Sequence, residues 1–477
     1  MNVLFFSTFH QSPHFLGLNL EFIQKNIDEG NKVYLIDCDG SFKKCGFNPY
    51  GLKYMCELCQ YREHKGLNLL NGEVIRISLS ELFTEEDHKI AQTFVNDIDI
   101  LTKEHEFKYF PVGESVLSSF ISKTRDREFP AVSDQKILKG LALNSIKIYL
   151  AVRKFIIKYR IEELFLLNGR WEYYRAALSA AREENLKIQV FENFRSGGYA
   201  EIFGNHLPHD ILNKKKLIES HWDKNADLNE KFRISDDFFK KKKLGQAVRD
   251  KAYTKDQTKG KLPEAYDPTK KTFVLYNSSD DEFAAVGKQF DNPFFQDQME
   301  GILYLTEYFQ NKTDSQLIVR MHPNLKGLTK DFLKPLFALK GKYENVIIIS
   351  PEEDIDTYEL MDVANTVISF GSTAGLEASY WGKPVILLGK CFYFYSNVAY
   401  VPKNSEEIPL LLRTDLPPLN NVEARKFGYY LLTGGTKTTY YNNSPEKKIF
   451  FKGNLLNELP GYLKLKYKAL KFLRWKN

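Results

Sequence analysis

Residues 367–389, VISFGSTAGLEASYWGKPVILLG, carry the clearest pattern of secondary structure in this chain. Its first four residues, 367–370, are apolar and partly β-branched, which is typical of a buried parallel strand. Gly371 permits a sharp turn, and a helical run follows until Gly382 ends it. Residues 385–388 are again apolar and predict a second buried strand. A strand, a helix and a second strand in this order predict an α/β fold built on a parallel sheet.

The turn between the first strand and the helix carries hydroxyl side chains. Ser372 or Thr373 can cap the helix by accepting a backbone hydrogen bond. The N–H groups and the positive end of the helix dipole at such a turn suit a phosphate. Glu377 lies one turn further along, where it can accept hydrogen bonds from sugar hydroxyls. An ordinary strand–helix turn that binds nothing is the alternative interpretation.

The length and composition bound the class of protein. A chain of 477 residues exceeds the size at which one hydrophobic core usually splits, so we expect two domains. Hydrophobic residues make up 43% and charged residues 27% of the chain, which indicates a globular protein. The net charge of +6 is too small to indicate nucleic-acid binding by itself. We see no signal peptide and no apolar run of about 18 residues, so we expect a cytoplasmic protein without a membrane span.

The N-terminal part begins with a strand–loop–helix–strand pattern. Residues 3–6 predict a first strand, Gly30 ends the helix, and residues 32–37 predict a second strand. A doubly wound, Rossmann-like domain begins in this way. The loop after the first strand, STFHQSPHF, carries His10 and His14 where such a domain meets its ligand. Either histidine can contact a substrate or act as a base, and a solvated loop histidine is the alternative.

Four of the five cysteines fall within residues 38–59. The final pair has the C-x2-C spacing of zinc and iron–sulfur ligands, whereas the C-x6-C spacing of the first pair is looser than in a usual zinc knuckle. We expect a loop without strong secondary structure here, which a structural zinc ion or iron–sulfur cluster would hold together. Four reduced thiols are the alternative. The predicted ligands are Cys38, Cys45, Cys56 and Cys59.

Polar residues follow two further predicted strands of the N-terminal part. Residues 163–167 predict a strand, and Arg170 lies in the turn at its end, where it can hold a phosphate or a carboxylate. Residues 188–191 predict another strand that ends in Glu192, a candidate general base. An ion pair between Arg170 and Glu192 is the structural alternative. A third candidate acid, Asp210, lies in the polar loop that follows.

The domain boundaries follow from composition. Residues 253–271 contain Lys, Gly, Pro, Asp and Thr without an apolar period, and we interpret them as an interdomain linker. The sequence thus predicts an N-terminal domain over residues 1–252 that includes the Cys-rich insertion. A C-terminal α/β domain over 272–421 and C-terminal helices over 422–477 follow. The lysine run 240–243 is interpreted as a solvated helix face.

Three predicted strands of the C-terminal domain end in polar residues. Ser278 and Ser279 follow the first of these strands. Arg320 and His322 stand at the end of the next, and His322 is suited to donate a hydrogen bond to a phosphate. Ser372 follows the strand of the opening stretch. Because the carboxyl ends of parallel strands meet at one edge of a sheet, these side chains predict a ligand site there.

The C-terminal tail, GYLKLKYKALKFLRWKN, is basic and carries no acid. Its apolar side chains can share one helical face, which is typical of attachment to an anionic membrane surface. A tail packed on the protein with a wet lysine face is the alternative. The basic residues are Lys464, Lys466, Lys468, Lys471, Arg474 and Lys476.

Two motifs carry a resemblance to a known family. RMHPN at 320–324 and SFGSTAGLEASYWGKPVILLG at 369–389 resemble the His-Pro and Ser-Thr-x-Gly motifs of bacterial capsule and surface-polysaccharide glycosyltransferases. That group includes enzymes that use CMP-Kdo, and transferases for CMP-sialic acid and polyol phosphate share the His-Pro pattern. The resemblance covers residues 272–400 well and the N-terminal half only in general plan. It implies the GT-B fold, in which two Rossmann-like domains face a cleft.

The resemblance also implies roles for individual residues. The donor phosphate would be held by His322, Ser372 and Thr373, and the ribose or sugar hydroxyls by Glu377. Ser278 and Ser279 would line the same pocket, and Arg320 belongs to this predicted donor-binding set. The acceptor would bind the N-terminal domain, with Arg170 as a contact. The expected catalytic bases there are, in order, Glu192, His10 and Asp210.

The expected function is transfer of a sugar from a nucleotide-activated donor, with a CMP-sugar such as CMP-Kdo favoured. The acceptor would be a growing surface or capsular polysaccharide or a lipid-linked saccharide, met at the inner face of the cytoplasmic membrane. No Asp-x-Asp motif is evident near the predicted sites, so we expect chemistry without a metal cofactor. A CDP-dependent polyol-phosphate transferase and a non-catalytic sugar- or nucleotide-binding partner in polysaccharide assembly are the alternatives. A nucleic-acid partner is not expected, because no strand interleaves basic and aromatic residues.

Overall fold

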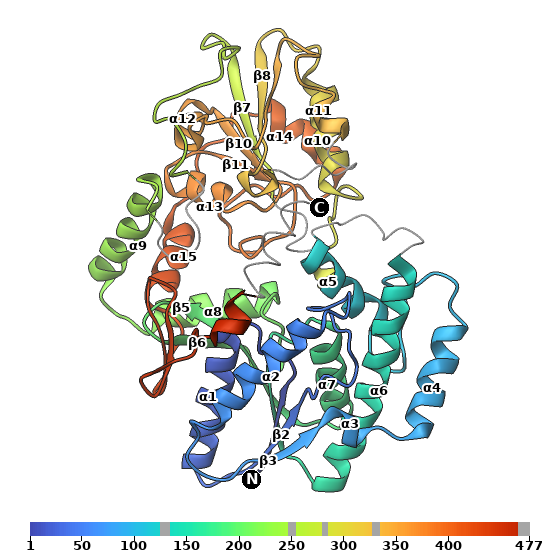
Figure 1. Cartoon of the computed structure of the whole chain (residues 1–477). Helices are drawn as coiled ribbons and strands as arrows, with labels where there is room; N and C mark the ends of the chain where they lie inside the picture. The colour runs from blue at the N-terminus through green and yellow to red at the C-terminus, as the bar shows by residue number, and fades with distance from the viewer. Residues whose placement is uncertain (125–133, 247–253, 279–284, 327–333, 466–477) are drawn as a thin grey trace. The chain divides into compact units, whose positions relative to one another are not determined.

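The computed structural model describes residues 1–124, 134–246, 254–278, 285–326 and 334–465 (Figure 1). The chain forms two compact units. Unit 1 contains residues 1–208 and 435–477, and unit 2 contains residues 209–434. Within the described residues, no helix combines the length and apolar character that crossing a membrane requires.

Unit 1 is built on a seven-stranded sheet in the order β12-β6-β5-β4-β1-β2-β3. The run from β5 to β3 is parallel, and the two strands at the other edge pair antiparallel. The strands are β1 (Asn2–Ser7), β2 (Lys32–Asp37), β3 (Ile75–Ser78), β4 (Glu163–Leu167), β5 (Lys187–Arg195), β6 (Tyr199–Ile202) and β12 (Thr436–Lys437). The helices are α1 (Pro13–Asp28), α2 (Lys53–Leu67), α3 (Leu79–Leu82), α4 (Glu85–Asn96), α5 (Val112–Thr124), α6 (Gln135–Tyr159) and α7 (Glu172–Glu183).

Unit 2 is built on a five-stranded, fully parallel sheet in the order β11-β10-β7-β8-β9. The strands are β7 (Lys271–Tyr276), β8 (Ser315–Arg320), β9 (Val346–Ile349), β10 (Thr366–Ser369) and β11 (Val385–Leu387). The α-helices are α8 (Ile211–Asp223), α9 (Leu228–Lys243), α10 (Gln298–Phe309), α11 (Lys334–Phe337), α12 (Thr357–Val363), α13 (Thr373–Tyr380), α14 (Ile408–Arg413) and α15 (Val422–Thr433). The predicted α/β class with two Rossmann-like sheets is confirmed, and the cleft between them stays a prediction.

The opening stretch folds as its sequence predicts. Ser372 is the N-cap of α13, and its hydroxyl accepts a hydrogen bond from the Ala374 N–H at 3.4 Å. Gly382 ends the helix with a φ of +76°, a conformation that costs glycine little. At Gly389 a Cβ atom would lie 2.8 Å from the carbonyl oxygen of Phe370, so the chain after β11 passes too close to β10 for a side chain.

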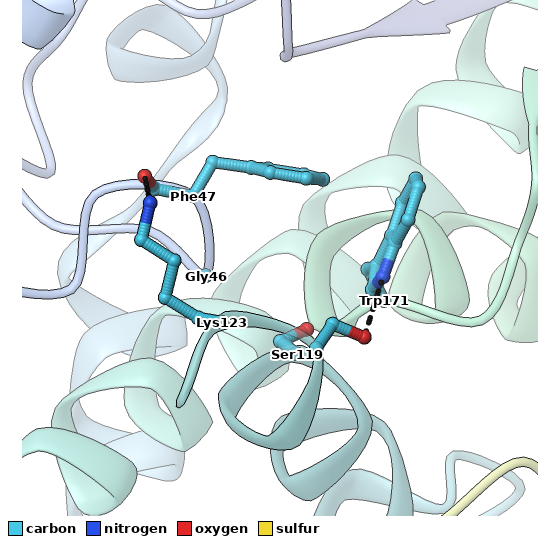
Figure 2. A pocket seen from close by; sticks show the side chains of 6 residues that line it. Gly46, Phe47, Ser119, Lys123 and Trp171 are labelled. Atoms are coloured by element: carbon cyan, nitrogen blue, oxygen red, sulfur yellow. Dashed lines mark hydrogen bonds between the residues drawn. The ribbon is translucent and has the colours of Figure 1, made fainter. Parts of the chain in front are cut away.

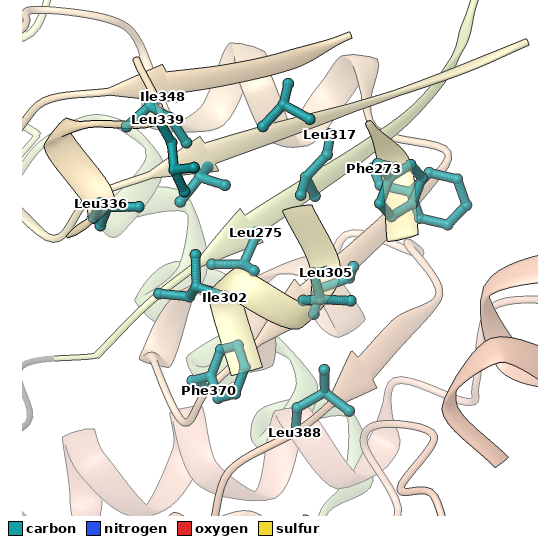
Figure 3. Close-up of a cluster of buried hydrophobic side chains, with 14 of the residues drawn as sticks. Phe273, Leu275, Ile302, Leu305, Leu317, Leu336, Leu339, Ile348, Phe370 and Leu388 are labelled. Atoms are coloured by element: carbon teal, nitrogen blue, oxygen red, sulfur yellow. The ribbon is translucent and has the colours of Figure 1, made fainter. Parts of the chain in front are cut away.

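The core of unit 2 supports the polar loop that follows β10. Apolar side chains of the strands pack with Ile302 and Leu305 of α10 (Figure 3). Phe370, the residue after β10, belongs to this cluster and is 3% exposed. A Cβ atom at Gly301 would lie 2.4 Å from the Phe370 ring, so α10 lies directly against that ring. This packing holds the end of β10 in place.

The unit boundaries differ from the predicted domains, because α8 and α9 pack on unit 2. The rings of Phe239 in α9 and Tyr380 in α13 stack with centroids 3.9 Å apart, and the Tyr380 hydroxyl donates to Asp236 at 2.5 Å. The predicted linker also lies along unit 2. The Gln257 side chain donates to Thr357 at 3.0 Å, and the Thr258 N–H donates to the Asp354 carbonyl at 2.8 Å.

The lysine run 240–243 is not only a solvated face. Lys242 forms an ion pair with Glu377 of α13 at 2.9 Å. Lys243 pairs with Asp362 of α12 at 2.8 Å and lies over the Trp381 ring. The prediction missed this docking role because both acidic partners are more than one hundred residues away in sequence.

The C-terminal segment returns to unit 1. Strand β12 pairs with β6, and β13 (Tyr441–Asn443), β14 (Ile449–Phe451) and β15 (Asn454–Leu455) form a small antiparallel sheet. The carboxylate of Glu21 in α1, fully buried, accepts backbone hydrogen bonds from Thr439, Tyr440 and Tyr441 at 2.6–2.8 Å. Most of the predicted basic tail, residues 466–477, lies outside the described residues.

The expectation of a loop across residues 38–59 is wrong for its second half. Cys56 and Cys59 lie on α2, which begins at Lys53. The helix buries Met55 and Leu58, and its Gly66 packs against Leu16 and Leu20 of α1. Its apolar residues are too few for a clear helical period, and tertiary packing rather than local pattern forms the helix.

Candidate functional site

Three adjacent strands of unit 2 end in polar residues, as the sequence predicts. Strand β7 lies between β10 and β8, so Ser278, His322 and Ser372 stand at neighbouring strand ends. Two hydrogen bonds join these ends. The His322 N–H donates to the Asn277 side-chain oxygen at 2.7 Å, and the Phe370 N–H donates to the Tyr276 carbonyl at 3.3 Å. Ser279, predicted beside Ser278, lies outside the described residues.

The ring of His322 is oriented by its own loop. Its Nδ1 accepts a hydrogen bond from the Asn324 N–H at 3.1 Å, so in the neutral ring the proton resides on Nε2. Nε2 is therefore a hydrogen-bond donor in both the neutral and the protonated ring. The side chain is partly exposed. A donor fixed at a strand end is the arrangement that a phosphate oxygen requires.

Hydrogen bonds to buried residues fix the conformation of the turn before α13. Gly371 has a φ of +100°, and its N–H donates to the Ser369 hydroxyl at 3.2 Å. The buried hydroxyl of Tyr393 donates to the Ser372 carbonyl. Thr373, at the first turn of the helix, is exposed. The turn thus presents the helix N-terminus and two hydroxyl side chains at one edge of the sheet, which suits an anion.

Two residues of the predicted donor-binding set are engaged by protein partners. Glu377 is 6% exposed and accepts a hydrogen bond from the Tyr358 hydroxyl in addition to its ion pair with Lys242. Arg320 is 2% exposed and donates to the backbone carbonyls of Ser350 at 2.8 Å and Glu353 at 3.1 Å. Arg320 therefore shapes the loop after β9, and its predicted contact with a donor has no support in this geometry.

Unit 1 has its own polar edge, at the ends of β4 and β5. The Glu192 carboxylate is partly buried and accepts a hydrogen bond from the Asn168 side chain at 2.5 Å. Burial raises the pKa of Glu192, while the Asn168 hydrogen bond and the charge of Arg170 oppose the rise. Arg170 donates to the Ser122 hydroxyl at 2.9 Å. Strand β5 continues past Glu192, but its parallel pairing with β4 ends at Phe191, so Glu192 still lies at the predicted edge.

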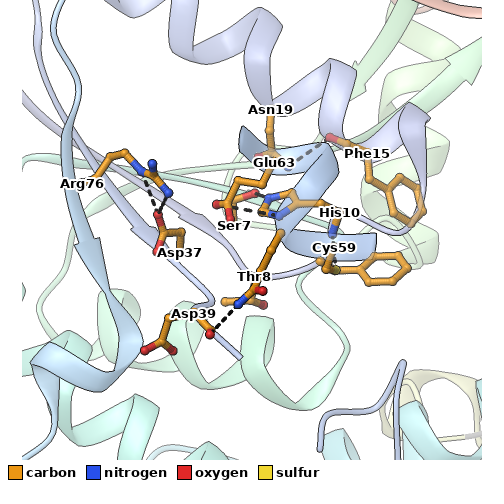
Figure 4. A network of polar contacts seen from close by, with 12 residues as sticks. Ser7, Thr8, His10, Phe15, Asn19, Asp37, Asp39, Cys59, Glu63 and Arg76 are labelled. Carbon is orange, nitrogen blue, oxygen red and sulfur yellow. Dashed lines mark hydrogen bonds and ion pairs between the residues drawn. The ribbon is translucent and has the colours of Figure 1, made fainter. Parts of the chain in front are cut away.

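His10 lies in an enclosed network of polar side chains (Figure 4). It is 3% exposed, its Nε2 is 2.8 Å from the Ser7 hydroxyl, and its Nδ1 is 3.8 Å from Glu63. Burial, with a contribution from the charge of Arg76, lowers the pKa of His10 to about 3. Burial raises the pKa of Glu63 to about 9, helped by the charge of Asp37. Both groups are neutral at pH 7, and the enclosed His10 ring does not favour its predicted role as a base.

Asp210 acts as a helix cap. It is the N-cap of α8, and its carboxylate accepts a hydrogen bond from the Asn213 N–H at 2.9 Å. It belongs to unit 2 rather than to the predicted N-terminal domain. A local capping role explains its position, so the geometry gives the predicted base role no support.

A small, partly open pocket lies beside the β4 edge in unit 1 (Figure 2). The rings of Phe47 and Trp171 form its apolar wall, with centroids 4.8 Å apart. The Lys123 ammonium donates to the Phe47 carbonyl, and the Trp171 ring N–H donates to Ser122 at 3.4 Å. Aromatic faces with nearby hydroxyls and a cation are groups that contact a sugar. Phe47 is not predictable as a site residue, because no local sequence pattern places it against Trp171.

The four clustered cysteines are free thiols in this structure. Burial raises the pKa of Cys38 and of Cys59 to about 12, and raises that of Cys45 well above its usual value. The Cys59 sulfur accepts a hydrogen bond from the His10 N–H at 3.2 Å. Across the part of the chain that the structure describes, no three His, Cys, Asp or Glu side chains gather as metal ligands. The geometry therefore does not support the predicted zinc or iron–sulfur site.

The match to a family model lies within unit 2. Residues 216–401 match the family model described as "Capsule polysaccharide biosynthesis protein". No curated protein sequence matches the chain at a significant level. Among solved structures, KpsC of Thermosulfurimonas dismutans, a beta Kdo 2,4 transferase, is 16% identical with a TM-score of 0.37, over 56% of this chain and 78% of that one.

A UDP-GlcNAc 2-epimerase from Neisseria meningitidis is 12% identical with a TM-score of 0.25, over 91% of this chain and 99% of that one. Similarity at these TM-scores assigns no function to the chain. The family match does not depend on these solved structures, and the matched residues include the loops of His322 and Ser372. Residues 216–401, less than half of the chain, are similar to the capsule polysaccharide biosynthesis family.

Proposed function

We propose that the protein is a GT-B glycosyltransferase that moves a sugar from a nucleotide-activated donor to a growing capsular or surface polysaccharide or a lipid-linked acceptor. One observation supports this most. His322, Ser372 and Thr373 stand at the ends of two strands that flank β7, inside the segment that matches the capsule family. A CMP-sugar such as CMP-Kdo is the favoured donor.

In this proposal unit 2 binds the leaving nucleotide. The Nε2–H of His322 and the first turn of α13 would hydrogen-bond the phosphate oxygens, with the hydroxyls of Ser372 and Thr373 beside them. Charge develops on the phosphate as the bond to the anomeric carbon breaks. Fixed donors at that position stabilise the transition state more than the ground state. Ser278 would line the same site, and no metal cofactor is required.

Glu377 would contact the donor hydroxyls while it keeps its two protein partners. Both of its carboxylate oxygens are engaged, one by Lys242 and the other by Tyr358. A hydroxyl group can add to an already bonded carboxylate, because each oxygen has two acceptor sites. Glu377 would therefore bind hydroxyls with Lys242 and Tyr358 still in place.

Unit 1 would bind the acceptor at the edge formed by β1, β4 and β5. Arg170 and the pocket of Phe47 and Trp171 lie at this edge and would contact the saccharide. A base in unit 1 would take the proton of the acceptor hydroxyl, whose oxygen then attacks the anomeric carbon. The basic tail would hold the protein at the inner face of the membrane.

A thermal-shift panel of CMP, CDP, UDP, GDP and their sugars tests the donor. Ligand binding to the native state raises its stability by RT ln(1 + [L]/Kd), so the true nucleotide raises the melting temperature. A shift with cytidine nucleotides alone supports a CMP-sugar donor, and a shift with UDP or GDP alone discards it. Product analysis then separates the alternatives: a polyol-phosphate transferase leaves the donor phosphate in the polymer. Tight binding without transfer would indicate a non-catalytic partner.

A further inference from the structure

His14 stands where three distant segments of unit 1 meet. It lies in the first turn of α1, just after the loop that follows β1. Its Nδ1 is 2.8 Å from the hydroxyl of Tyr441 in β13, and that hydroxyl donates to the side-chain oxygen of Asn193 in β5 at 3.0 Å. Asn193 follows Glu192 at the end of the parallel part of β5. His14 is thus at the ligand-binding edge of the unit 1 sheet.

The hydrogen bonds fix which ring nitrogen carries the proton. A tyrosine hydroxyl has one hydrogen, and in Tyr441 it is directed to Asn193. The Tyr441 oxygen can therefore only accept from His14, so Nδ1 of His14 carries the ring proton. Nε2 is left with its lone pair. Within the described part of the chain, no side chain hydrogen-bonds this nitrogen, and the His14 side chain is partly exposed.

The surroundings keep the ring neutral. Burial and the charge of Lys447, which follows β13, lower the pKa of His14. The positive end of the α1 dipole acts in the same direction. The other titratable group against the ring is the Tyr441 hydroxyl, whose pKa is raised by burial, so it stays protonated. The ring is held as a neutral base whose Nε2 has no hydrogen-bond partner among the described residues.

The neighbours of His14 suit a saccharide. The ring of the next residue, Phe15, lies 6.0 Å from that of Trp171 and 5.7 Å from that of Phe9 (centroid distances). Phe9 in turn stacks on Phe47, which with Trp171 walls the pocket of Figure 2. A row of packed aromatic rings therefore extends from beside His14 to the pocket, in which Phe9 and Trp171 are buried while Phe15 and Phe47 are partly exposed. An exposed aromatic face can stack on the apolar face of a sugar ring.

We propose that His14 is the general base that activates the acceptor hydroxyl, with Tyr441 and Asn193 as its positioning residues. This inference rests on the proposed glycosyl transfer. Nε2 takes the proton of the acceptor hydroxyl as its oxygen bonds to the anomeric carbon. The bond from that carbon to the donor phosphate breaks, and the nucleotide leaves with the electron pair. His10 cannot take this role, because its Nε2 is bound to Ser7 and its ring is enclosed.

The test compares three variants in full-length protein, with CMP-Kdo or whichever nucleotide sugar stabilises the protein in the panel. His14→Gln keeps a polar side chain but no base, and we expect kcat to fall about 100-fold or more with the donor thermal shift unchanged. Tyr441→Phe should lower kcat about tenfold and move the acidic limb of the pH profile, because the ring loses its orientation. The matched control is His64→Gln, an exposed histidine on α2, which should match wild type.

If the wild type transfers sugar and the His14→Gln variant does so equally fast, the role of His14 is overturned and the proposed function still stands. Absence of transfer by the wild type with every donor would overturn both. A second measurement, on the wild type, tests the proposal even if the His14→Gln variant fails to fold. In ¹⁵N-histidine NMR of the wild type, one ring should be the Nδ1-protonated tautomer with a pKa below 6.5, and Tyr441→Phe should change that signal. An Nε2-protonated tautomer at His14 would refute the proposal.

Discussion

The ammonium of Lys242 lies 2.9 Å from the carboxylate of Glu377, and it joins α9 to the helix that follows the predicted phosphate-binding turn. The Glu377 side chain is 8% exposed and the Lys242 side chain 30%. Lys241, its neighbour, instead pairs with Asp237 on the same helix with both side chains nearly half exposed. The two adjacent lysines thus offer a buried and an exposed ion pair on one helix.

Lys242→Met should destabilise unit 2 by about 1–3 kcal/mol, because it leaves a nearly buried carboxylate without its cation. Lys241→Met removes an exposed pair and should cost at most about 0.5 kcal/mol. Urea midpoints of the two variants give the comparison. The double variant Lys242→Met/Glu377→Gln should recover part of the loss. Equal midpoints for the two single variants would contradict the role given to Lys242.

His322→Ala should weaken binding of the nucleotide by roughly 10–100-fold, since a hydrogen bond to a charged group contributes about 1.5–3 kcal/mol. Isothermal titration with the nucleotide that gives the thermal shift measures this loss. His88→Ala, an exposed histidine on α4 in unit 1, is the control and should bind as wild type does. An unchanged dissociation constant in His322→Ala would remove His322 from the donor site.

The buried Glu63 should make the stability of unit 1 depend on pH. Its pKa is raised from 4.5 to about 9, so the folded state holds a proton that the unfolded state releases. This stabilisation is complete below pH 4.5 and is lost as the pH rises toward 9. The depressed pKa of His10 acts only below pH 6.5, so the comparison with a Glu63 variant is made from pH 6.5 to 9.

Over that range the melting temperature of wild type should fall relative to that of Glu63→Gln, which keeps the shape but has no titrating proton. Glu57→Gln, on the same helix, serves as the matched variant. Parallel pH curves for wild type and Glu63→Gln would show that Glu63 is not held neutral.

Glu21→Ala should destabilise unit 1 by about 3 kcal/mol or more, because three backbone N–H groups of the returning segment lose their shared acceptor. Glu29→Ala, at the exposed end of the same helix, should change stability by less than about 0.5 kcal/mol. Chemical unfolding measures both. Limited proteolysis should also cut the 435–465 segment faster in Glu21→Ala, and equal rates would show that the segment is held elsewhere.

Gly389→Ala and Gly140→Ala should have opposite effects. The Cβ at position 389 would meet the Phe370 carbonyl at 2.8 Å and disturb the turn before α13, whereas position 140 has nothing within 4 Å. Alanine at position 140 of α6 should raise the free energy of unfolding by about 0.4–1 kcal/mol, because it reduces the conformational entropy of the unfolded chain. Alanine at 389 should lower both stability and nucleotide binding, and a neutral result would show that the turn can relax.

Much of the fold was predictable, because local signals are strong where a strand meets a turn. In the opening stretch, the strand and the stop at Gly382 were predicted correctly, and of the two predicted caps, Ser372 and Thr373, Ser372 is the N-cap. Strands at Lys32–Asp37, Glu163–Leu167 and Val346–Ile349 match their predicted ranges to within one residue. Apolar runs bounded by Gly, Asn or Pro specify such buried strands without reference to the rest of the chain.

The partners of the polar residues were not predictable in the same way. The sequence predicted Glu377 and Arg320 near a donor. Only the folded chain shows that Glu377 pairs with Lys242 and accepts a hydrogen bond from Tyr358. It also shows that Arg320 donates to the loop after β9. The sequence placed the four cysteines in one loop, but packing against α1 turns half of that loop into α2. Spacing along the chain cannot show which side chains satisfy one another across it.

Two α/β sheets and the polar ends of β7, β8 and β10 follow from local sequence, because strand periodicity and turn residues act over a few neighbours. Three other features depend on the folded chain: α8 and α9 join unit 2, residues 435–465 return to unit 1, and Tyr441 contacts His14 across 427 positions of sequence. Those choices depend on which apolar faces and buried hydrogen-bonding groups find partners, and that is settled by the whole folded chain.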